Sequence, residues 1–210
     1  MKNPALKKTV LSGAAVVAAV GLLGGCALLK TPDPVQTYRF GGDVTAVNTA
    51  PAATPVQVQL RRIEFPQAAR GDKMLGITGT EAAYIMGARW VTPAEQLYAD
   101  SLTNAFVSQS TRVRLIGRRE LTPVTRLLDV DVQAFEARYA AAGSAPTVVV
   151  SVRARLLTFP ERTVVSEQTF TVSQPATANR AGDIVQAFDI ASRDVNTQVV
   201  AWTDASVGAR

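Results

Sequence analysis

The chain has 210 residues, of which 47% are hydrophobic, and its 22 basic and 17 acidic residues give a formal net charge of +5. It contains no histidine and a single cysteine, Cys26. This composition excludes Ser-His-Asp and Cys-His catalysis, intramolecular disulfides and the usual zinc sites, because each of them needs imidazole or more than one thiolate.

The first twenty-five residues have the three parts of a secretory signal peptide. Small residues before Cys26 close an apolar run that begins at Val10. This run of about fourteen residues is shorter than the roughly twenty that a membrane-spanning helix needs. We therefore expect residues 1–25 to be removed as a signal peptide. The basic start of the segment contains Lys2, Lys7 and Lys8.

Leu23-Gly24-Gly25-Cys26 resembles a bacterial lipobox. The resemblance implies that Cys26 is acylated and becomes the mature N-terminus, and two or more acyl chains are enough for stable membrane anchoring. Ala27, not aspartate, follows the cysteine, and this pattern favours the outer membrane. The alternative is a small-residue cleavage site that happens to contain a cysteine.

Removal of the signal peptide also changes the charge that a partner meets. Nineteen basic residues would then face seventeen acidic ones, a net charge of about +2. A protein that is nearly neutral and faces the periplasm has no nucleic acid to bind, so we expect none as a partner.

Residues 26–36 contain Pro32 and Pro34 and show no periodicity, which is typical of a tether. Such a segment reaches at most about 35 Å. Residues 37–210 suit one domain with one hydrophobic core. Alternating side chains in its first half predict two strands and then a hairpin that turns at Gly79-Thr80. These strands cover Thr37–Phe40, Val56–Leu60, Met74–Thr78 and Ala82–Met86.

The stretch Thr92-Pro93-Ala94-Glu95 predicts the start of a helix. Thr92 would cap the helix, Pro93 would occupy its first turn, and Glu95 would complete a capping box. Apolar residues then recur at helical spacing until about Ser108, so one stripe should face the core. This stripe consists of Tyr98, Leu102, Ala105 and Phe106.

The second half of the chain reads as strands followed by a long helix. After a short strand at Arg112–Leu115, apolar residues alternate from Leu128 to Val132 and then change parity at Phe135, which predicts a bulge near Ala134. The next two strands should form a hairpin, and steps of three and four predict an amphipathic helix. These last three elements cover Val148–Leu156, Val164–Val172 and Arg180–Trp202.

The predicted elements define the fold class. We expect a single α+β domain with a mostly antiparallel sheet and two amphipathic helices packed on one of its faces.

Asp129 and Asp131 are two apart on a predicted strand, so their side chains point the same way about 7 Å apart. Such a pair could serve glycoside hydrolysis or hold a cation. If the next strand folds back so that Asp131 lies opposite Arg153, then Asp129 lies opposite Arg155. We favour this interpretation, a structural charge ladder between the two strands.

Five further residues are candidates for contacts. Trp90 is expected in the core or as a staple residue, and otherwise as a partner contact, because tryptophan is enriched at binding hot spots. Arg112, Arg114, Arg118 and Arg119 are read first as a solvated edge that discourages strand aggregation. The alternative is that they bind phospholipid headgroups or an acidic partner surface.

The order of these elements carries a family resemblance. Val58-Gln59-Leu60 precedes a proline-containing turn, Leu128–Val132 continues into Phe135-Glu136, and the long helix ends the chain. The first predicted helix adds Pro93, Leu97 and Leu102 after Arg89-Trp90. With the lipobox, this pattern resembles the ABC-type transport auxiliary lipoproteins over nearly all of the mature chain. It departs from the family at Met74–Thr78, which is more apolar and contains a glycine.

The resemblance implies a non-enzymatic component of a trans-envelope lipid transport system. Family members work with an inner-membrane ABC transporter or related permease and with a periplasmic MCE-domain protein. The lipoprotein would dock this machine at the outer membrane. The resemblance transfers no catalytic residue, and we expect no metal and no cofactor besides the acyl chains on Cys26.

The sequence leaves the oligomeric state and the function with alternatives. Exposed strand edges would allow a homo-oligomer without requiring one. A second hypothesis is a structural or assembly lipoprotein of another envelope complex, for outer-membrane or lipopolysaccharide assembly. A third is a lipid-anchored hydrolase that relies only on carboxylates.

Overall fold

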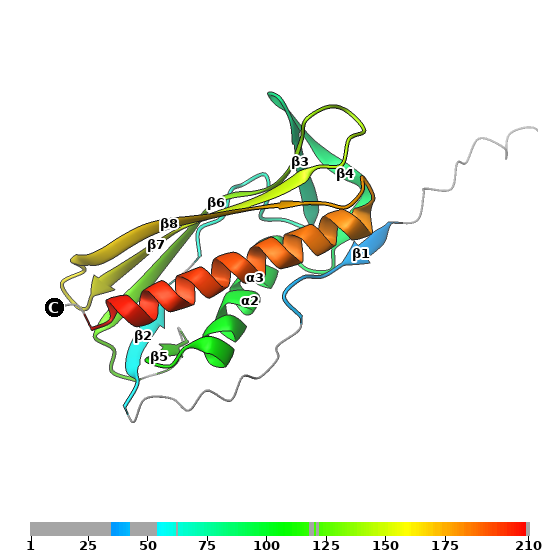
Figure 1. Ribbon diagram of the computed structural model, residues 1–210. Helices are drawn as coiled ribbons and strands as arrows, with labels where there is room; N and C mark the ends of the chain where they lie inside the picture. The colour runs from blue at the N-terminus through cyan, green and yellow to red at the C-terminus, as the bar shows by residue number, and fades with distance from the viewer. Residues whose placement is uncertain (1–34, 43–53, 62, 118–119, 121, 209–210) are drawn as a thin grey trace, which may run out of the picture. The chain divides into compact units, whose positions relative to one another are not determined.

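The computed structural model describes residues 35–42, 54–61, 63–117, 120 and 122–208 (Figure 1). These residues form eight strands and two helices. The strands are β1 (Gln36–Tyr38), β2 (Val56–Leu60), β3 (Lys73–Thr78), β4 (Glu81–Trp90), β5 (Val113–Ile116), β6 (Arg126–Tyr139), β7 (Thr147–Thr158) and β8 (Val164–Pro175). The helices are α2 (Ala94–Gln109) and α3 (Ala181–Ser206).

Strand β6 is the centre of the sheet. On one side it pairs with β7 in antiparallel direction, and β8 continues the sheet beyond β7. The other side of β6 is shared by two shorter strands, because β2 pairs with its first residues and β3 with its last. Strand β5 extends the sheet beyond β2, while β4 and then β1 extend it beyond β3.

The α+β class and the single sheet are confirmed, but the prediction that the sheet is mostly antiparallel was wrong. Four of the seven strand pairings within the described residues are parallel: β1 with β4, β2 with β5, β2 with β6, and β3 with β6. Alternation of apolar residues reports which face of a strand is buried, and it carries no information on the direction of the neighbouring strand.

The register of β6 confirms the predicted bulge. Val132 lies opposite Val152, whereas Ala134 lies opposite Ser151, so the register shifts between Val132 and Ala134. One extra residue turns the following side chains to the other face. As a result, Val132 and Phe135 both point into the core, although they have opposite parity in the sequence.

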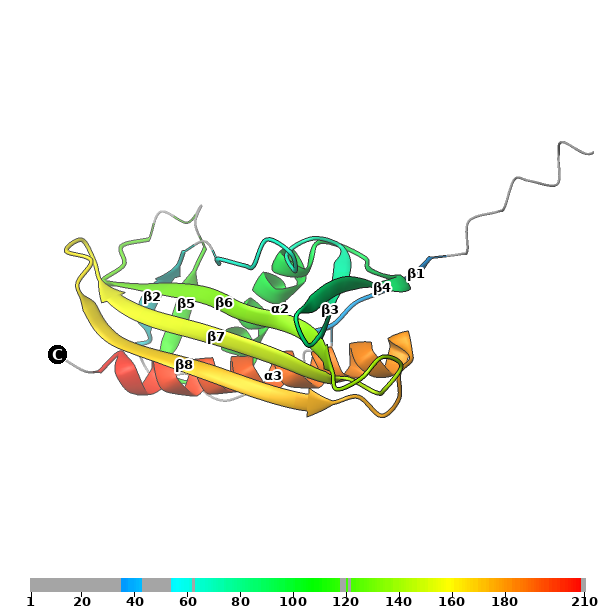
Figure 2. The same ribbon diagram turned by 90° about the horizontal axis from the view of Figure 1, so that it is seen from above.

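Both helices cover the same face of the long strands, as predicted. Helix α3 packs along β7 and β8, and α2 packs against α3 and β5. Figures 1 and 2 show the two helices on one side of the layer formed by β6, β7 and β8. Neither helix within the described ranges is long and apolar enough to cross a membrane.

Helix α2 begins where the sequence predicts, but its N-terminus is held in another way. The predicted cap by Thr92 was wrong, because Pro93 is the N-cap residue and no side chain bonds to the first turn. The N–H groups of Ala94 and Glu95 instead donate to the backbone carbonyls of Gly71, at 2.9 Å, and Arg70, at 3.2 Å. The chain before β3 therefore satisfies the donors that a cap would otherwise satisfy.

The core is organised around Phe135. Its ring centroid lies 4.7 Å from that of Phe188 on α3 and 5.3 Å from those of Phe40 and Phe65. These rings join the inner face of the sheet to α3 and to the segments that follow β1 and β2. Aromatic pairs at such separations add to the stabilisation that comes from burial alone.

Candidate functional site

The predicted acylation site Cys26 lies outside the described residues, as do Arg118 and Arg119. Acylation of Cys26 therefore stays a prediction that depends on the sequence motif. Of the four candidate arginines, the structure describes Arg112 and Arg114.

Trp90 belongs to the core. Its side chain is 2% exposed, and its ring lies 5.1 Å from that of Phe40 and 5.4 Å from that of Phe188. The preferred interpretation of Trp90 as a core residue is therefore confirmed. An indole packed in this way has no exposed surface with which to contact a partner.

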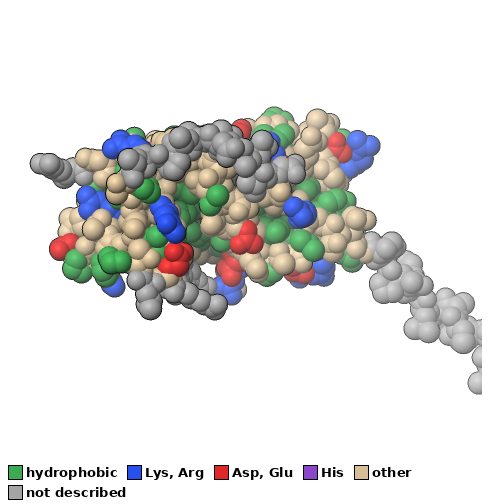
Figure 3. Space-filling model, turned by 90° about the horizontal axis from the view of Figure 1, so that it is seen from below, with side chains coloured by type: hydrophobic (Ala, Val, Ile, Leu, Met, Phe, Trp, Pro, Cys, Tyr) green, Lys and Arg blue, Asp and Glu red, His purple; other side chains and the backbone are tan. Residues whose placement is uncertain are grey.

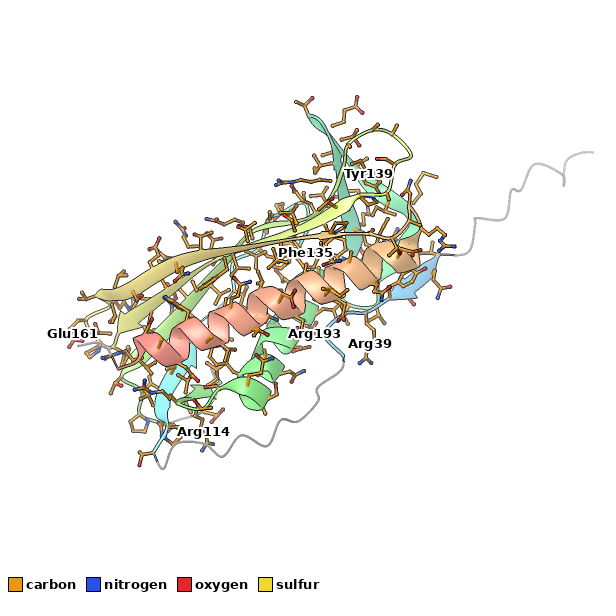
Figure 4. All side chains as sticks on the ribbon, in the orientation of Figure 1. Arg39, Arg114, Phe135, Tyr139, Glu161 and Arg193 are labelled. Atoms are coloured by element: carbon orange, nitrogen blue, oxygen red, sulfur yellow. The ribbon has the colours of Figure 1, made fainter. Side chains whose placement is uncertain are left out.

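Arg112 and Arg114 are exposed at the outer end of the sheet. Arg114 is part of β5, which pairs with β2 on one side, and Figure 4 shows its side chain pointing away from the body of the domain. Arg112 precedes β5, and its backbone carbonyl accepts a hydrogen bond of 2.8 Å from the N–H of Val56. The backbone thus fixes the start of this edge, while the Arg112 guanidinium lies beside Gly208, just after α3.

Basic and acidic side chains are interspersed on the face of the domain that Figure 3 shows, together with small apolar areas. Charges mixed in this way are typical of a solvated protein surface. The basic side chains on this face do not merge into one large basic surface.

The charge ladder predicted from Asp129 and Asp131 is confirmed. Asp131 lies opposite Arg153, with 3.0 Å between carboxylate oxygen and guanidinium nitrogen. Asp129 lies opposite Arg155 at 3.5 Å, and its carboxylate also pairs with Arg61 at 3.1 Å. Both carboxylates are thus held by guanidinium groups on the outer face of the sheet.

A metal site would need several ligating side chains in one place. Within the described part of the chain, no three carboxylate, imidazole or thiol side chains come together in a way that could hold an ion. Asp129 and Asp131 have arginines as their ion-pair partners.

The sequence did not predict the most exposed apolar part of the structure, which is the hairpin of β3 and β4. The hairpin extends away from the layer of long strands (Figure 1). The first seven residues of β4 are exposed or half-buried, and Met86 is 91% exposed. The one sequence signal was the unusually apolar, glycine-containing strand at Met74–Thr78.

Two local features shape this hairpin. Gly87 has a φ of 70°, and the register between β3 and β4 shifts there, so the strand bends away from its neighbours. At Gly76, an added Cβ would lie 3.1 Å from the Tyr139 ring. Gly76 therefore allows this ring to lie directly against the hairpin backbone.

A hollow of about 310 Å³ lies between the hairpin and the connection from β6 to β7. Partial burial raises the pKa of Tyr139, which forms one of its walls. Its lining is mainly apolar and lacks a cluster of acid and base groups, so the geometry suits contact more than chemistry. The remaining lining residues include Thr78, Ala83, Ile85, Ala142 and Asn179.

A second hollow, of about 380 Å³, separates the residues after β1 from the N-terminal half of α3. Asp189 spans it, because its carboxylate accepts a hydrogen bond of 2.7 Å from the N–H of Gly41 and also pairs with Arg193. The lining residues Arg39, Gln186 and Asp189 make this hollow more polar than the first. Because the Asp189 carboxylate is already engaged in these contacts, its role is to fasten the residues after β1 to α3.

Comparison with solved structures shows the same fold in other bacterial proteins. The crystal structure of protein XCC0632 from Xanthomonas campestris is 25% identical, with a TM-score of 0.68 over 82% of this chain and 96% of that chain. The hypothetical protein CT253 from Chlamydia trachomatis is 10% identical, with a TM-score of 0.54 over 75% of this chain and 100% of that chain. A comparison with curated protein sequences found no match.

A family model described as the ABC-type transport auxiliary lipoprotein component matches residues 38–200. The match runs from the last residue of β1 into the last turns of α3, and thus includes β2 to β8, the whole of α2 and most of α3. The chain therefore belongs to the ABC-type transport auxiliary lipoprotein family.

Proposed function

We propose that this protein is an outer-membrane lipoprotein that docks the periplasmic part of an ABC/MCE-type lipid transport system without catalysing a reaction. The observation that carries the proposal is the family match over residues 38–200. The lipobox that ends at Cys26 supports membrane attachment, and Ala27 after the cysteine supports the outer membrane. The partners would be a periplasmic MCE-domain protein and an inner-membrane ABC transporter or permease.

A docking role fits the chemistry of the described residues. The carboxylate pair most suited to hydrolysis, Asp129 and Asp131, forms ion pairs with arginines on a solvated face. A glycosidase needs one carboxyl group that stays protonated and a second that faces it across a substrate. Asp129 and Asp131 do not meet this requirement, because they lie on the same strand, each opposite an arginine of β7, and do not face each other across a space for substrate.

Co-purification tests the proposed partners. The lipoprotein, tagged at its C-terminus and extracted in mild detergent, should bring down an MCE-domain protein together with the transporter ATPase or permease. Recovery of outer-membrane or lipopolysaccharide assembly proteins instead would replace the proposal with the assembly hypothesis.

Replacement of the acceptor thiol tests the anchor. Cys26→Ser should move the protein from the membrane to the soluble fraction, because an unacylated chain loses its hydrophobic attachment. Mass spectrometry of the native protein should find diacylglycerol on Cys26 and no signal peptide. An unmodified thiol or an uncut leader would contradict the anchored role.

The four arginines are the candidate contacts within this proposal. Arg112 and Arg114 are exposed, and their planar guanidinium groups are well suited to an acidic partner surface. Reversing Arg118 and Arg119 to glutamate should weaken co-purification. A second variant would also reverse Arg112 and Arg114. If it still recovers the partners unchanged, all four arginines belong to a solvated edge and do not contact a partner.

A further inference from the structure

Exposed apolar side chains gather along one edge of the described domain. Among the described residues, seven large hydrophobic side chains are exposed, and four of them lie on β1 and β4 or next to these strands. We call these four the anchor-side patch. They are Val35 at 50%, Tyr84 at 44%, Met86 at 91% and Val91 at 57% exposure.

The hydrogen-bond register brings the members of this patch together. Gln36 is the partner of Ala88 in the parallel pairing of β1 and β4, so Val35 lies beside Gly87 and next to Met86. The N–H of Val91 donates to the carbonyl of Tyr38 at 2.8 Å. The patch thus extends along the β1–β4 edge from the exposed part of β4 to the end of β1.

Beyond β1, the edge of β4 has no strand partner among the described residues, because β1 pairs with Ala88–Trp90 alone. The bond from Val91 to Tyr38 shows that alternate residues of β1, Tyr38 and Gln36, direct their backbone groups toward β4. The next two in this series are Pro34 and Pro32, which have no N–H to donate. The chain's own N-terminal segment therefore does not match this edge.

The surroundings of the patch have the composition of a membrane interface. Lys73 Nζ lies 4.8 Å from the centre of the Tyr84 ring. From Ala82 to Trp90 the only charged residue is Arg89. Tyrosine and lysine are the residues that sit at the headgroup level, where the ring or the long stem meets the acyl boundary and the polar end stays hydrated.

The position of the lipobox identifies what covers the patch. Cys26 precedes Val35 by nine residues. A chain of this length reaches at most about 30 Å, so lipid attached to Cys26 stays within that distance of Val35. Two other exposed residues, Phe159 and Val164, flank the turn between β7 and β8, at the opposite end of the long strands (Figure 1). Strand β7 alone spans about 40 Å, which places that turn beyond easy reach of the same leaflet.

We propose that the anchor-side patch rests on the lipid leaflet that holds the acyl chains of Cys26. This inference depends on the proposed lipid anchor. Met86 and Val35 enter the boundary between headgroups and acyl chains, while Tyr84 and Lys73 stay among the headgroups, which include anionic phosphatidylglycerol. The open edge of β4 stays in the hydrated zone, because unpaired backbone groups are not tolerated in hydrocarbon.

This contact gives the domain a fixed orientation. Arg114 and Glu161 lie at the end of the domain away from β1 (Figure 4). With the anchor-side patch on the leaflet, this far end and the arginine edge of β5 point into the periplasm. The membrane contact and the partner contact thus use opposite ends of one domain.

Site-directed fluorescence tests the orientation. An acylated Cys26 does not react with thiol reagents, so Met86→Cys can be labelled alone with the dye NBD and reconstituted into vesicles of phosphatidylethanolamine and phosphatidylglycerol. We expect a blue shift of emission, quenching by doxyl lipids and several-fold slower reduction by dithionite. Labels at Val164→Cys and Val107→Cys, both at exposed positions, are the matched controls and should react as in water. Equal reduction rates at 86 and 164 would overturn the inference.

Vesicle affinity of the unanchored protein gives a second measurement. In the Cys26→Ser background, Met86→Ser should lower binding to the same vesicles about tenfold, the effect of withdrawing one buried methionine side chain. Val107→Ser should leave binding unchanged. Both side chains are more than three quarters exposed, so thermal unfolding should match that of the parent in both variants.

The experiment separates failure of the inference from failure of the anchor. Uptake of dye by the protein without an introduced cysteine would show a free thiol at Cys26 and contradict the proposed anchor. The labelled variants, with Cys26→Ser, would then be attached through an N-terminal hexahistidine segment to vesicles with nickel-chelating lipid. On these vesicles, a label at position 86 that dithionite reduces as fast as in water would overturn the membrane contact. Protection that appears only after a periplasmic partner is added would overturn it as well.

Discussion

Asp129 on β6 lies opposite Arg155 on β7, and the same carboxylate is also paired with Arg61 from the segment after β2. One side chain thereby connects three parts of the sheet. Its carboxylate is 16% exposed, so it is less screened than a surface pair would be.

Removal of this charge should weaken the sheet. We expect Asp129→Asn to lower the free energy of unfolding by about 1 kcal/mol, because two ion pairs are lost. Glu167→Gln is the control: Glu167 also lies opposite Arg155, but it is exposed. Urea denaturation measures both variants. Equal losses for the two would show that the Asp129 network contributes nothing specific.

Phe135 should be the most sensitive position in the core. Phe135→Ala removes the ring that contacts Phe40, Phe65 and Phe188, and we expect a loss of about 3–5 kcal/mol in the free energy of unfolding. Phe159→Ala, at an exposed turn, should change it by less than about 0.5 kcal/mol. Chemical denaturation followed by far-UV circular dichroism distinguishes the two, and a similar small effect at both positions would contradict the central role of Phe135.

Tyr98 should make the protein sensitive to alkali. Complete burial raises the pKa of its phenol far above the ordinary value, so the folded state keeps the proton while the unfolded chain releases it above about pH 10. Stability is therefore fully present below that pH and is lost as the pH rises further. Tyr98→Phe should flatten this decline.

The same substitution should be harmless at neutral pH. The Tyr98 hydroxyl has no hydrogen-bond partner among the described residues, so Tyr98→Phe should leave the free energy of unfolding unchanged or raise it by about 1 kcal/mol. Urea titrations at pH 7 and above pH 10 test both effects. A clear loss of stability at pH 7 would reveal a hydrogen bond that the hydroxyl makes.

Asp204 should be important for the C-terminal end of α3. Its carboxylate accepts hydrogen bonds from the Ser110 hydroxyl at 2.6 Å and from the Thr111 N–H at 2.8 Å, so it fastens α3 to the connection between α2 and β5. Asp204→Ala should lower the free energy of unfolding by about 1–3 kcal/mol. Asp194→Ala, an exposed position on the same helix, should have little effect. Thermal unfolding of both variants decides whether this contact matters.

Local patterns in the sequence were sufficient for much of the fold. The parity change between Val132 and Phe135 located the bulge in β6, and the spacing of Asp129 and Asp131 against Arg153 and Arg155 gave the register of β6 and β7. Both features arise from neighbouring segments, in which the alternation of side chains directly reflects the pairing.

Other features depend on contacts that the sequence pattern does not record. The parallel pairing of β2 and β3 with β6 joins distant segments, and the carbonyls of Arg70 and Gly71 replaced the expected cap by Thr92. The exposure of Met86 was missed because an apolar strand has the same sequence pattern whether its own chain or a different molecule covers it.

The N–H of Trp90 donates to the backbone carbonyl of Asp72 at 2.7 Å. This hydrogen bond holds the two ends of the β3–β4 hairpin side by side. The bonds from Ala94 and Glu95 to the preceding residues secure the same junction. A loop closed at its base can be lengthened cheaply, since doubling its length costs only about 0.6 kcal/mol. A longer or shorter β3–β4 hairpin should therefore be accommodated at this junction while the rest of the domain folds as before.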